Sequence, residues 1–241
     1  MVLLFLNRSR AHRNLKTAVS VAALLYALLF SSCAQLPEYA QPRFHTSPDA
    51  LSTVTSGFRY RELTVEDFKA ESLPADYQQY HDSINARSCL SIRPTNSTNA
   101  QISKVPYYGN TLYVGNFNHI SFEALFVPSC SWWSPNVAGS KRAYVLQHEQ
   151  IHFAISELTA RRVTNELAAK MKDYTAIGGT DVEVRDDLMK VLMDSVHEIV
   201  GSELEIHTDF DEDTSLFFDE EKQEDWLAEM ENRLKTSDIS P

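Results

Sequence analysis

The chain has 241 residues, of which 43% are hydrophobic, and this is enough for a packed core and argues against intrinsic disorder. Its 22 basic and 33 acidic residues give a formal net charge of -11. Because phosphate binding needs a basic face, nucleic acid is excluded as an expected partner.

Residues 1–33 predict an export signal with a lipobox-like end. Four basic residues precede an apolar run at residues 19–30, and two serines then lead into Cys33. The run is shorter than the roughly 20 residues of a comfortable membrane span, which favours a cleaved signal peptide. Small residues before a cysteine are typical of bacterial lipoproteins, in which Cys33 would carry the lipid, although Phe30 stands where leucine is usual. Ordinary cleavage after Ala34 is the alternative.

These features predict an exported protein, held by the lipid on Cys33 to the membrane at the periplasmic face of the outer membrane. A soluble periplasmic or secreted protein is the alternative. Loss of residues 1–32 removes four basic residues and no acidic ones, so the charge falls from -11 to -15. The polar, proline-containing residues 34–56 predict a linker, followed by a single domain at residues 57–236.

Two further cysteines, Cys89 and Cys130, lie within the predicted domain. In an exported protein an isolated pair most simply forms one disulfide. The bond would close a loop of about 40 residues and stabilise the fold by about 3–4 kcal/mol. Two unpaired thiols are the alternative.

The first part of the domain, residues 57–137, predicts strands. Thr64 could cap a short helical turn that runs into Asp67. Four short, partly alternating segments separated by turn-forming residues then indicate a small, mostly antiparallel sheet; they are residues 89–92, 101–105, 111–114 and 120–124.

The second part, residues 138–236, predicts three helices, so that the expected fold class is α+β. Apolar periodicity places the helices at residues 140–171, 182–206 and 220–234. We expect a turn at residues 176–180 between the first two helices and an acidic loop between the last two.

The first of these helices carries the pattern H-E-x-x-H. At about 100° per residue, His148 and His152 lie one turn apart on the same face, which is the spacing of two zinc ligands. Glu149 stands beside them, free to act on a water at the metal. Two hydrogen-bonded histidines on a partly buried helix are the simpler alternative, but they leave Glu149 unexplained.

Zinc chemistry then predicts a mechanism and a substrate. The metal would activate a water, Glu149 would take its proton as the general base, and the water would attack the carbonyl of a peptide or protein substrate. The sequence therefore predicts a zinc metallopeptidase.

A third ligand must come from elsewhere in the chain. Glu157 is nine residues after His148, about 180° around a straight helix, and is excluded. The continuation with a glycine and a third histidine is absent after His152. The candidates lie downstream and are His197, Glu198, Glu203, His207, Asp209 and Asp211.

Residues 146–162, L-Q-H-E-Q-I-H-F-A-I-S-E-L-T-A-R-R, resemble the signature of a bacterial family of predicted secreted zinc-dependent proteases. The resemblance extends weakly back through residues 63–68 and 131–133. It extends forward through residues 210–214 to Gln223 and Trp226, along a family pattern of aromatic-Asp-x-x-Thr-x-His-Gly followed by Gln and Trp.

The resemblance implies Asp211 as the third zinc ligand, with His207 the next candidate. Leu216 and Phe217 stand where the family has its His-Gly pair. If the family histidine binds the metal, this chain lacks a ligand, and an inactive relative with the same fold is then the alternative.

Two functions of other classes compete with the peptidase. One is a non-catalytic envelope lipoprotein that uses the fold as a binding or assembly module. The other is a structural lipoprotein stabilised by calcium at residues 209–220, where oxygen-bearing side chains follow the spacing of an EF-hand loop. Thr214 replaces the glycine that such a loop needs, so a solvated acidic turn is the simpler interpretation.

Overall fold

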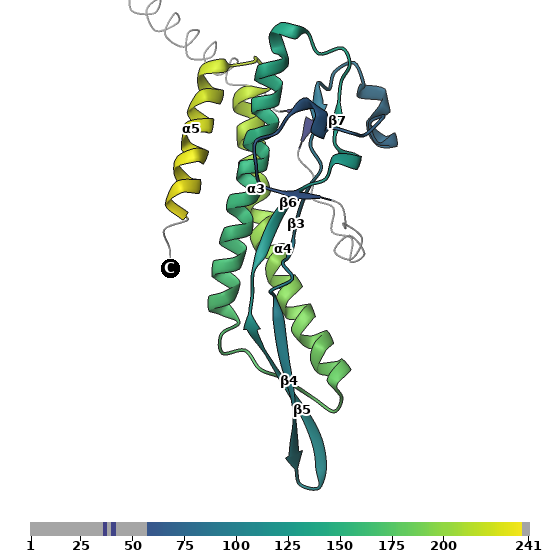
Figure 1. The fold of residues 1–241 in the computed structure, drawn as a ribbon, viewed down its shortest axis with the longest axis vertical. Helices are drawn as coiled ribbons and strands as arrows, with labels where there is room; N and C mark the ends of the chain where they lie inside the picture. Colours follow the sequence, from purple (N-terminus) through teal and green to yellow (C-terminus); the bar gives the residue numbers. More distant parts are fainter. Residues whose placement is uncertain (1–35, 38–39, 42–56, 238–241) are drawn as a thin grey trace, which may run out of the picture. The chain divides into compact units, whose positions relative to one another are not determined.

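The computed structural model describes residues 36–37, 40–41 and 57–237 (Figure 1). The predicted signal peptide, the lipid on Cys33 and most of the predicted linker fall outside these residues. No helix within the described residues has both the length and the apolar character needed to cross a membrane.

The described residues form an α+β fold, as predicted. Antiparallel strands dominate the amino-terminal half, in three small sheets with the strand orders β1-β6-β3, β2-β7 and β4-β5-β8. All four predicted strands are present, as β3 to β6. The strands are β1 (Phe58–Arg59), β2 (Ala86–Arg87), β3 (Leu90–Pro94), β4 (Asn99–Tyr107), β5 (Asn110–His119), β6 (Phe122–Phe126), β7 (Trp132–Trp133) and β8 (Ala176–Gly178).

Three long helices make up most of the carboxy-terminal half, also as predicted. They are α3 (Arg142–Lys170), α4 (Asp181–Thr214) and α5 (Glu220–Ser237). Four short 3-10 helices join the strands and lead into α3; they are η2 (Val65–Asp67), η3 (Ala75–Tyr80), η4 (Pro128–Cys130) and η5 (Gly139–Lys141). The predicted turn after Thr64 is η2, in which the backbone N–H of Thr64 donates to the carboxylate of Asp67 at 2.8 Å.

The main core lies between β6 and α3. The strand β6 is central in its sheet. Every residue of β6 is buried, so both faces of the strand are covered. Phe126 from β6 and Phe153 from α3 are both fully buried, with ring centroids 5.8 Å apart. This packing fixes α3, and with it the H-E-x-x-H pattern, against the sheet β1-β6-β3.

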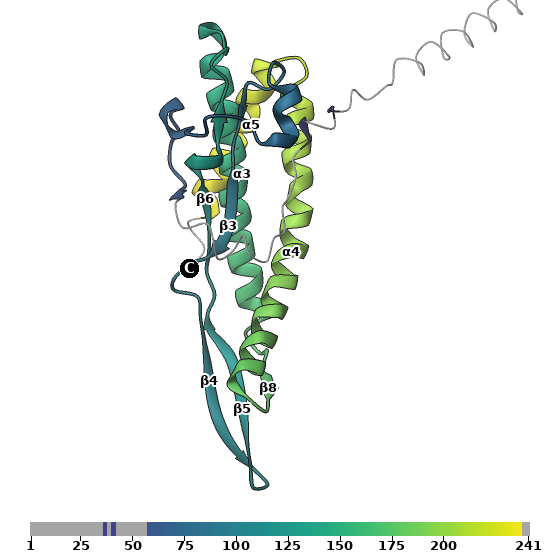
Figure 2. The same ribbon diagram turned by 90° about the vertical axis from the view of Figure 1, so that its right-hand side faces the viewer.

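A β-hairpin, β4 and β5, extends beyond this core and packs against α4 (Figure 2). Residues 176–180, predicted to be only a turn, contribute β8, which pairs with β5 through Ile177 opposite Val114. The contact with α4 depends on Gly115, because a Cβ there would lie 2.5 Å from a methyl group of Val184. A close approach of this kind is what a strand glycine permits.

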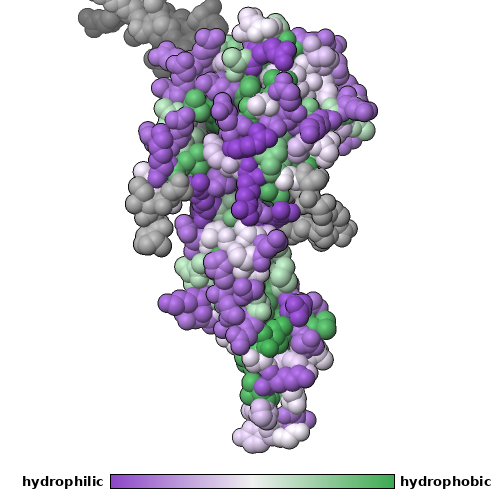
Figure 3. Space-filling model, in the orientation of Figure 1, coloured by the Kyte–Doolittle hydropathy of each residue, from purple (hydrophilic) through white to green (hydrophobic). Residues whose placement is uncertain are grey.

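The surface near this hairpin includes several exposed apolar side chains among hydrophilic ones (Figure 3). Tyr108 at the hairpin turn is 90% exposed, and Ile177 and Val182 are exposed on the adjoining elements. Pro106 and Lys104 stand on β4, which is the edge strand of its sheet. Proline and lysine on an edge strand discourage pairing with another chain.

The prediction that the second helix ends at residue 206 is wrong. The helix α4 continues to Thr214, through the stretch predicted to be an acidic loop. Asp209 is exposed, whereas Phe210, Asp211 and Thr214 are buried, so this last part of the helix has a polar face and a packed face. The EF-hand-like loop predicted at residues 209–220 is therefore not formed, because its first positions lie on a regular helix rather than around a loop.

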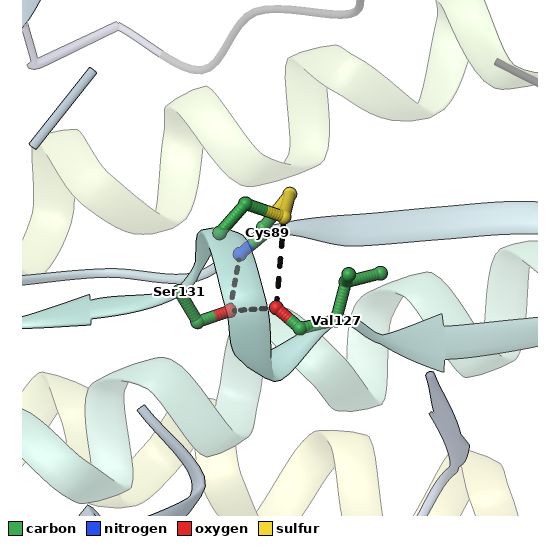
Figure 4. Close-up of a disulfide and its surroundings, with 4 residues drawn as sticks. Cys89, Val127 and Ser131 are labelled. Atoms are coloured by element: carbon green, nitrogen blue, oxygen red, sulfur yellow. Dashed lines mark hydrogen bonds between the residues drawn. A yellow bond between two sulfur atoms is a disulfide. The ribbon is translucent and has the colours of Figure 1, made fainter. Parts of the chain in front are cut away.

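The predicted disulfide is present and joins Cys89 to Cys130 (Figure 4). Ser131 supports it, since its hydroxyl accepts from the backbone N–H of Cys89 and donates to the carbonyl oxygen of Val127, each at 2.9 Å. The bond ties the residue before β3 to η4, and so to the segment that leads into α3.

Candidate metal centre

The helix α3 positions the three residues of the H-E-x-x-H pattern. Apolar residues are buried around most of its circumference, so its polar residues are held in a packed environment rather than in free solvent. The side chains of His148 and His152 are each 13% exposed, and Glu149 is 5% exposed. The two imidazoles lie next to each other, with ring centroids 4.8 Å apart.

The helix α4 brings Asp211 to these histidines. Its Oδ1 lies 2.9 Å from Nε2 of His148 and 3.1 Å from Nε2 of His152, and the two Nε2 atoms are 3.1 Å apart. Asp211 can reach this position only because α4 continues beyond residue 206. His148, His152 and Asp211 thus lie close enough together to bind one metal ion.

The three ligand atoms fit a tetrahedral metal closely. Ligand atoms about 2.05 Å from a tetrahedral zinc ion are separated from one another by about 3.3 Å. The separations of 2.9–3.1 Å are a few tenths of an ångström shorter. Small side-chain rotations would bring these separations to the tetrahedral value. Two imidazole nitrogens with one carboxylate oxygen are ligands that bind zinc and other transition metals.

Neighbouring side chains orient the two imidazoles. The hydroxyl of Thr214 donates to the carbonyl oxygen of Phe210 at 2.7 Å, so it can only accept from Nδ1–H of His148, 3.3 Å away. The proton is then on Nδ1, and Nε2 of His148 faces Asp211 with its lone pair. Such outer hydrogen bonds fix the tautomer of metal-binding histidines.

His207 plays the corresponding part for His152. Their Nδ1 atoms are 2.8 Å apart, and their rings are stacked with centroids 5.1 Å apart. Burial and the neighbouring charge of His152 lower the pKa of His207 to about 3, so His207 is neutral and can accept the Nδ1–H of His152. His207, the second candidate for the third ligand, therefore supports a ligand instead of joining the cluster.

Interactions within the cluster also shift the pKa values of Asp211 and His152. Burial opposes the charged form of Asp211, but the charge of His152 and the hydrogen bonding within the cluster outweigh burial, and the pKa of this carboxyl lies below its ordinary range. Burial likewise opposes protonation of His152, but the carboxylate of Asp211 prevails and raises its pKa. Asp211 is therefore available as an anionic ligand.

Glu149 forms no hydrogen bond with His148, His152 or Asp211 among those described, but it lines the same cavity. One of its carboxylate oxygens accepts the backbone N–H of Ser88 at 3.0 Å, which connects α3 to the segment just before β3. This bond fixes the carboxylate next to the candidate metal ligands without using any of them.

A cavity of about 510 Å³ opens beside the cluster and gives a ligand access to it. Its lining comes from α3, α4, η3 and the segment from β2 to β3. His148, Glu149, His152, His207 and Asp211 all contribute to the lining. The chemical groups of the candidate site therefore face a space large enough for part of a peptide.

The remaining candidates for the third ligand lie elsewhere. His197, Glu198 and Asp209 are exposed on α4. Glu203 is buried, but it forms an ion pair with Arg162. Glu157, excluded by its angle on the helix, pairs with Arg161 at 2.9 Å.

The two residues that replace the family's His-Gly pair follow the end of α4. Leu216 lines the cavity, whereas Phe217 is 78% exposed. Neither offers a ligand atom, so the cluster of His148, His152 and Asp211 is completed without them.

Three contributors to the site were not predicted. Thr214 lies three residues after Asp211 on α4. If residues 210–214 had been predicted as helix, both side chains would have been expected on one face of it. Tyr144, which donates to the carbonyl oxygen of Thr214 at 2.8 Å, precedes His148 by one helical turn. No signal in the sequence indicates the part taken by Ser88, because its contact is made by the backbone.

Comparisons of the chain with protein-family models, with curated proteins and with solved structures found no significant match.

Proposed function

We propose that the protein is a zinc-dependent peptidase of the bacterial cell envelope, with His148, His152 and Asp211 as the zinc ligands. The observation that carries this proposal is the convergence of Nε2 of both histidines and Oδ1 of Asp211, within 3.1 Å of one another, beside a carboxylate and an open cavity. The resemblance of residues 146–162 to a family of secreted zinc-dependent proteases points in the same direction.

Zinc in this cluster would polarise a substrate carbonyl and lower the pKa of a coordinated water to about 7. Glu149 would accept the proton of the attacking water and later donate it to the leaving amine. The hydrogen bond from Ser88 holds the carboxylate of Glu149 in place for both transfers. The hydrogen bonds that His148 and His152 donate from Nδ1, to Thr214 and His207, would leave Nε2 of each histidine to bind the metal.

The free edge of β3 offers a way to hold a peptide. The carbonyl oxygen of Cys89 accepts from Val127 on the side of β6, and backbone polar groups alternate in direction along an antiparallel strand. The N–H and C=O groups of Leu90 and Ile92 therefore point to the opposite side. No strand in the described part of the chain covers that side, and both residues line the cavity. An extended substrate could pair there as an added strand.

Export and a lipid on Cys33 complete the proposal. The disulfide between Cys89 and Cys130 supports export, because such bonds persist mainly in oxidising compartments. A lipid on Cys33 would be found as a mass increase of the mature amino-terminal peptide.

The test is metal analysis combined with an activity assay on the purified mature protein. We expect about one zinc per chain, lost in His148→Ala and in His152→Ala, together with hydrolysis of casein. Glu149→Gln should keep the zinc but reduce hydrolysis by at least about a thousandfold, because its amide cannot take a proton.

His197→Ala is the matched control, since this histidine is exposed on α4 and does not line the cavity. It should change neither zinc content nor hydrolysis. Zinc binding without hydrolysis would instead support the non-catalytic envelope module, and absence of zinc from the intact protein would overturn the proposal.

A further inference from the structure

A short segment that precedes the domain forms part of the wall of the cavity at the candidate metal centre. The residues of this segment that line the cavity are Leu36, Pro37, Ala40 and Gln41. Leu36 is only 4% exposed. Its burial removes an aliphatic side chain from water, which favours the position of the segment against the domain.

Internal hydrogen bonds give the segment a turned conformation. The backbone N–H of Ala40 donates to the carbonyl oxygen of Pro37 at 2.8 Å, and Nε2 of Gln41 donates to the carbonyl oxygen of Leu36 at 3.4 Å. The segment is drawn in purple in Figure 2. Its backbone is therefore partly satisfied from within while the leucine side chain is buried.

Leu36 is buried outside the apolar core and lines the cavity instead. The four clusters of buried apolar residues found in the described part of the chain do not include Leu36. The cavity itself offers apolar lining from Tyr77, Ile84 and Val145, next to the polar groups of His148 and Glu149. Leu36 thus lines the same cavity as the candidate catalytic groups and lies outside the apolar core.

We propose that the cavity has a subsite for an aliphatic side chain of a peptide, and that Leu36 occupies this subsite as a resident competitor. The choice of a peptide as ligand rests on the proposed function, but the proposal concerns binding and needs no catalysis. A tethered competitor acts at an effective concentration on the order of millimolar. A peptide must therefore displace Leu36 before it can bind.

The probe is a fluorescein-labelled synthetic peptide that copies residues 35–41, Gln-Leu-Pro-Glu-Tyr-Ala-Gln. Its binding to the full chain is measured by fluorescence anisotropy. We expect Leu36→Asp to bind the peptide with a Kd at least tenfold lower than the wild-type chain, because the charged side chain leaves the apolar subsite. A second peptide with aspartate in place of its leucine should bind neither protein.

Equal Kd values for the two proteins, or no binding by either, would overturn the proposal, as would equal binding of the two peptides. Val182→Asp is the matched control, since it places the same charge at an exposed apolar residue outside the cavity lining. It should leave the Kd unchanged. If Leu36→Asp does not fold, as judged by circular dichroism, Leu36→Ala should still lower the Kd at least threefold.

The casein assay separates this proposal from the proposed function, because the subsite does not depend on proton transfer. Peptide binding that is strengthened by Leu36→Asp, without casein hydrolysis by any variant, would contradict the peptidase and leave the subsite supported.

Discussion

The two imidazoles of the candidate metal centre are oriented by quite different partners. His148 donates to a hydroxyl, whereas Nδ1 of His152 lies 2.8 Å from Nδ1 of a second imidazole, that of His207. The ring of Phe210 packs against both histidines, with centroids 4.5 Å from His148 and 5.0 Å from His152. Hydrogen bonds set the tautomers, and the aromatic contact sets the positions of the rings.

Loss of the His207 acceptor should weaken metal binding without abolishing it. His207→Phe keeps a ring stacked on His152 but leaves the Nδ1–H of His152 without its acceptor. We expect zinc affinity to fall by about 10–100-fold, which is typical when an outer hydrogen bond to a metal ligand is removed. Competition with a chromogenic zinc chelator measures the change. An unchanged affinity would contradict the supporting part assigned to His207.

Asp67 should contribute stability in a pH-dependent manner. Burial would raise the pKa of its carboxyl, but hydrogen bonds from Arg61 and Thr64 outweigh burial and lower it. Since the folded pKa lies below the unfolded value of about 3.9, the stabilisation is complete above that pH and is lost as the pH falls through the folded pKa. Asp67→Asn should therefore unfold more easily at pH 7, by about 1–2 kcal/mol.

Urea denaturation of both proteins at pH 7 and at pH 3 checks this expectation. The difference in the free energy of unfolding should shrink at pH 3, where the wild-type carboxylate begins to be protonated. A difference of the same size at both pH values would show that the charge of Asp67 is not the cause.

At the scale of the elements, the apolar periodicity of the sequence predicted a helix correctly where the residues of that helix alone define it. The helix α3 and its three motif residues follow directly from apolar spacing and the H-E-x-x-H pattern. The end of α4 does not, because aspartate is a poor helix former and residues 207–214 hold three of them. Burial of Phe210 and Asp211 against α3 and α5 overrides that local preference.

Two other features of the structure could not have been predicted from local sequence. The strand β8 has only three residues, followed by Gly179, and exists because β5 offers it an edge. The burial of Leu36 depends on a cavity built from distant parts of the chain. The helix geometry excluded Glu157 and left six downstream residues as candidates for the third ligand. Only the resemblance favoured Asp211 among these candidates.

The contact between β5 and α4 should be sensitive to a single methyl group. Gly115→Ala would place a Cβ 2.5 Å from the stiff, β-branched side chain of Val184 and 3.1 Å from Leu188. We expect a loss of about 1–3 kcal/mol in the free energy of unfolding, as for other overpacked cores. Thermal and urea denaturation measure it.

Gly201→Ala is the matched control and should act in the opposite direction. Gly201 lies within α4, and a Cβ there would meet no atom within 4 Å. Alanine in a helix interior is favoured over glycine by about 1 kcal/mol, so this variant should be more stable than the wild type. Destabilisation by both variants would point to a general intolerance of α4 instead of the close contact at Gly115.

At the scale of the whole molecule, one covalent bond in the described part of the chain joins the residue before β3 to η4, and so to the segment that leads into α3. The Cys89–Cys130 disulfide joins residues separated by 41 positions. Replacing both cysteines by alanine should lower the free energy of unfolding by about 3–4 kcal/mol, and urea denaturation checks this. Wild-type protein in the presence of a reductant should behave like the double variant. A reductant effect that persists in the double variant would have another origin.

The position of this bond also makes the candidate site dependent on its surroundings. Cys89 directly follows Ser88, whose backbone N–H holds the carboxylate of Glu149, and it precedes the strand whose free edge faces the cavity. While both thiols are reduced, this corner is held only by non-covalent contacts. Oxidation would therefore act as a maturation step, since it would fix Glu149, the proposed proton acceptor, and the proposed peptide-binding edge at the same time.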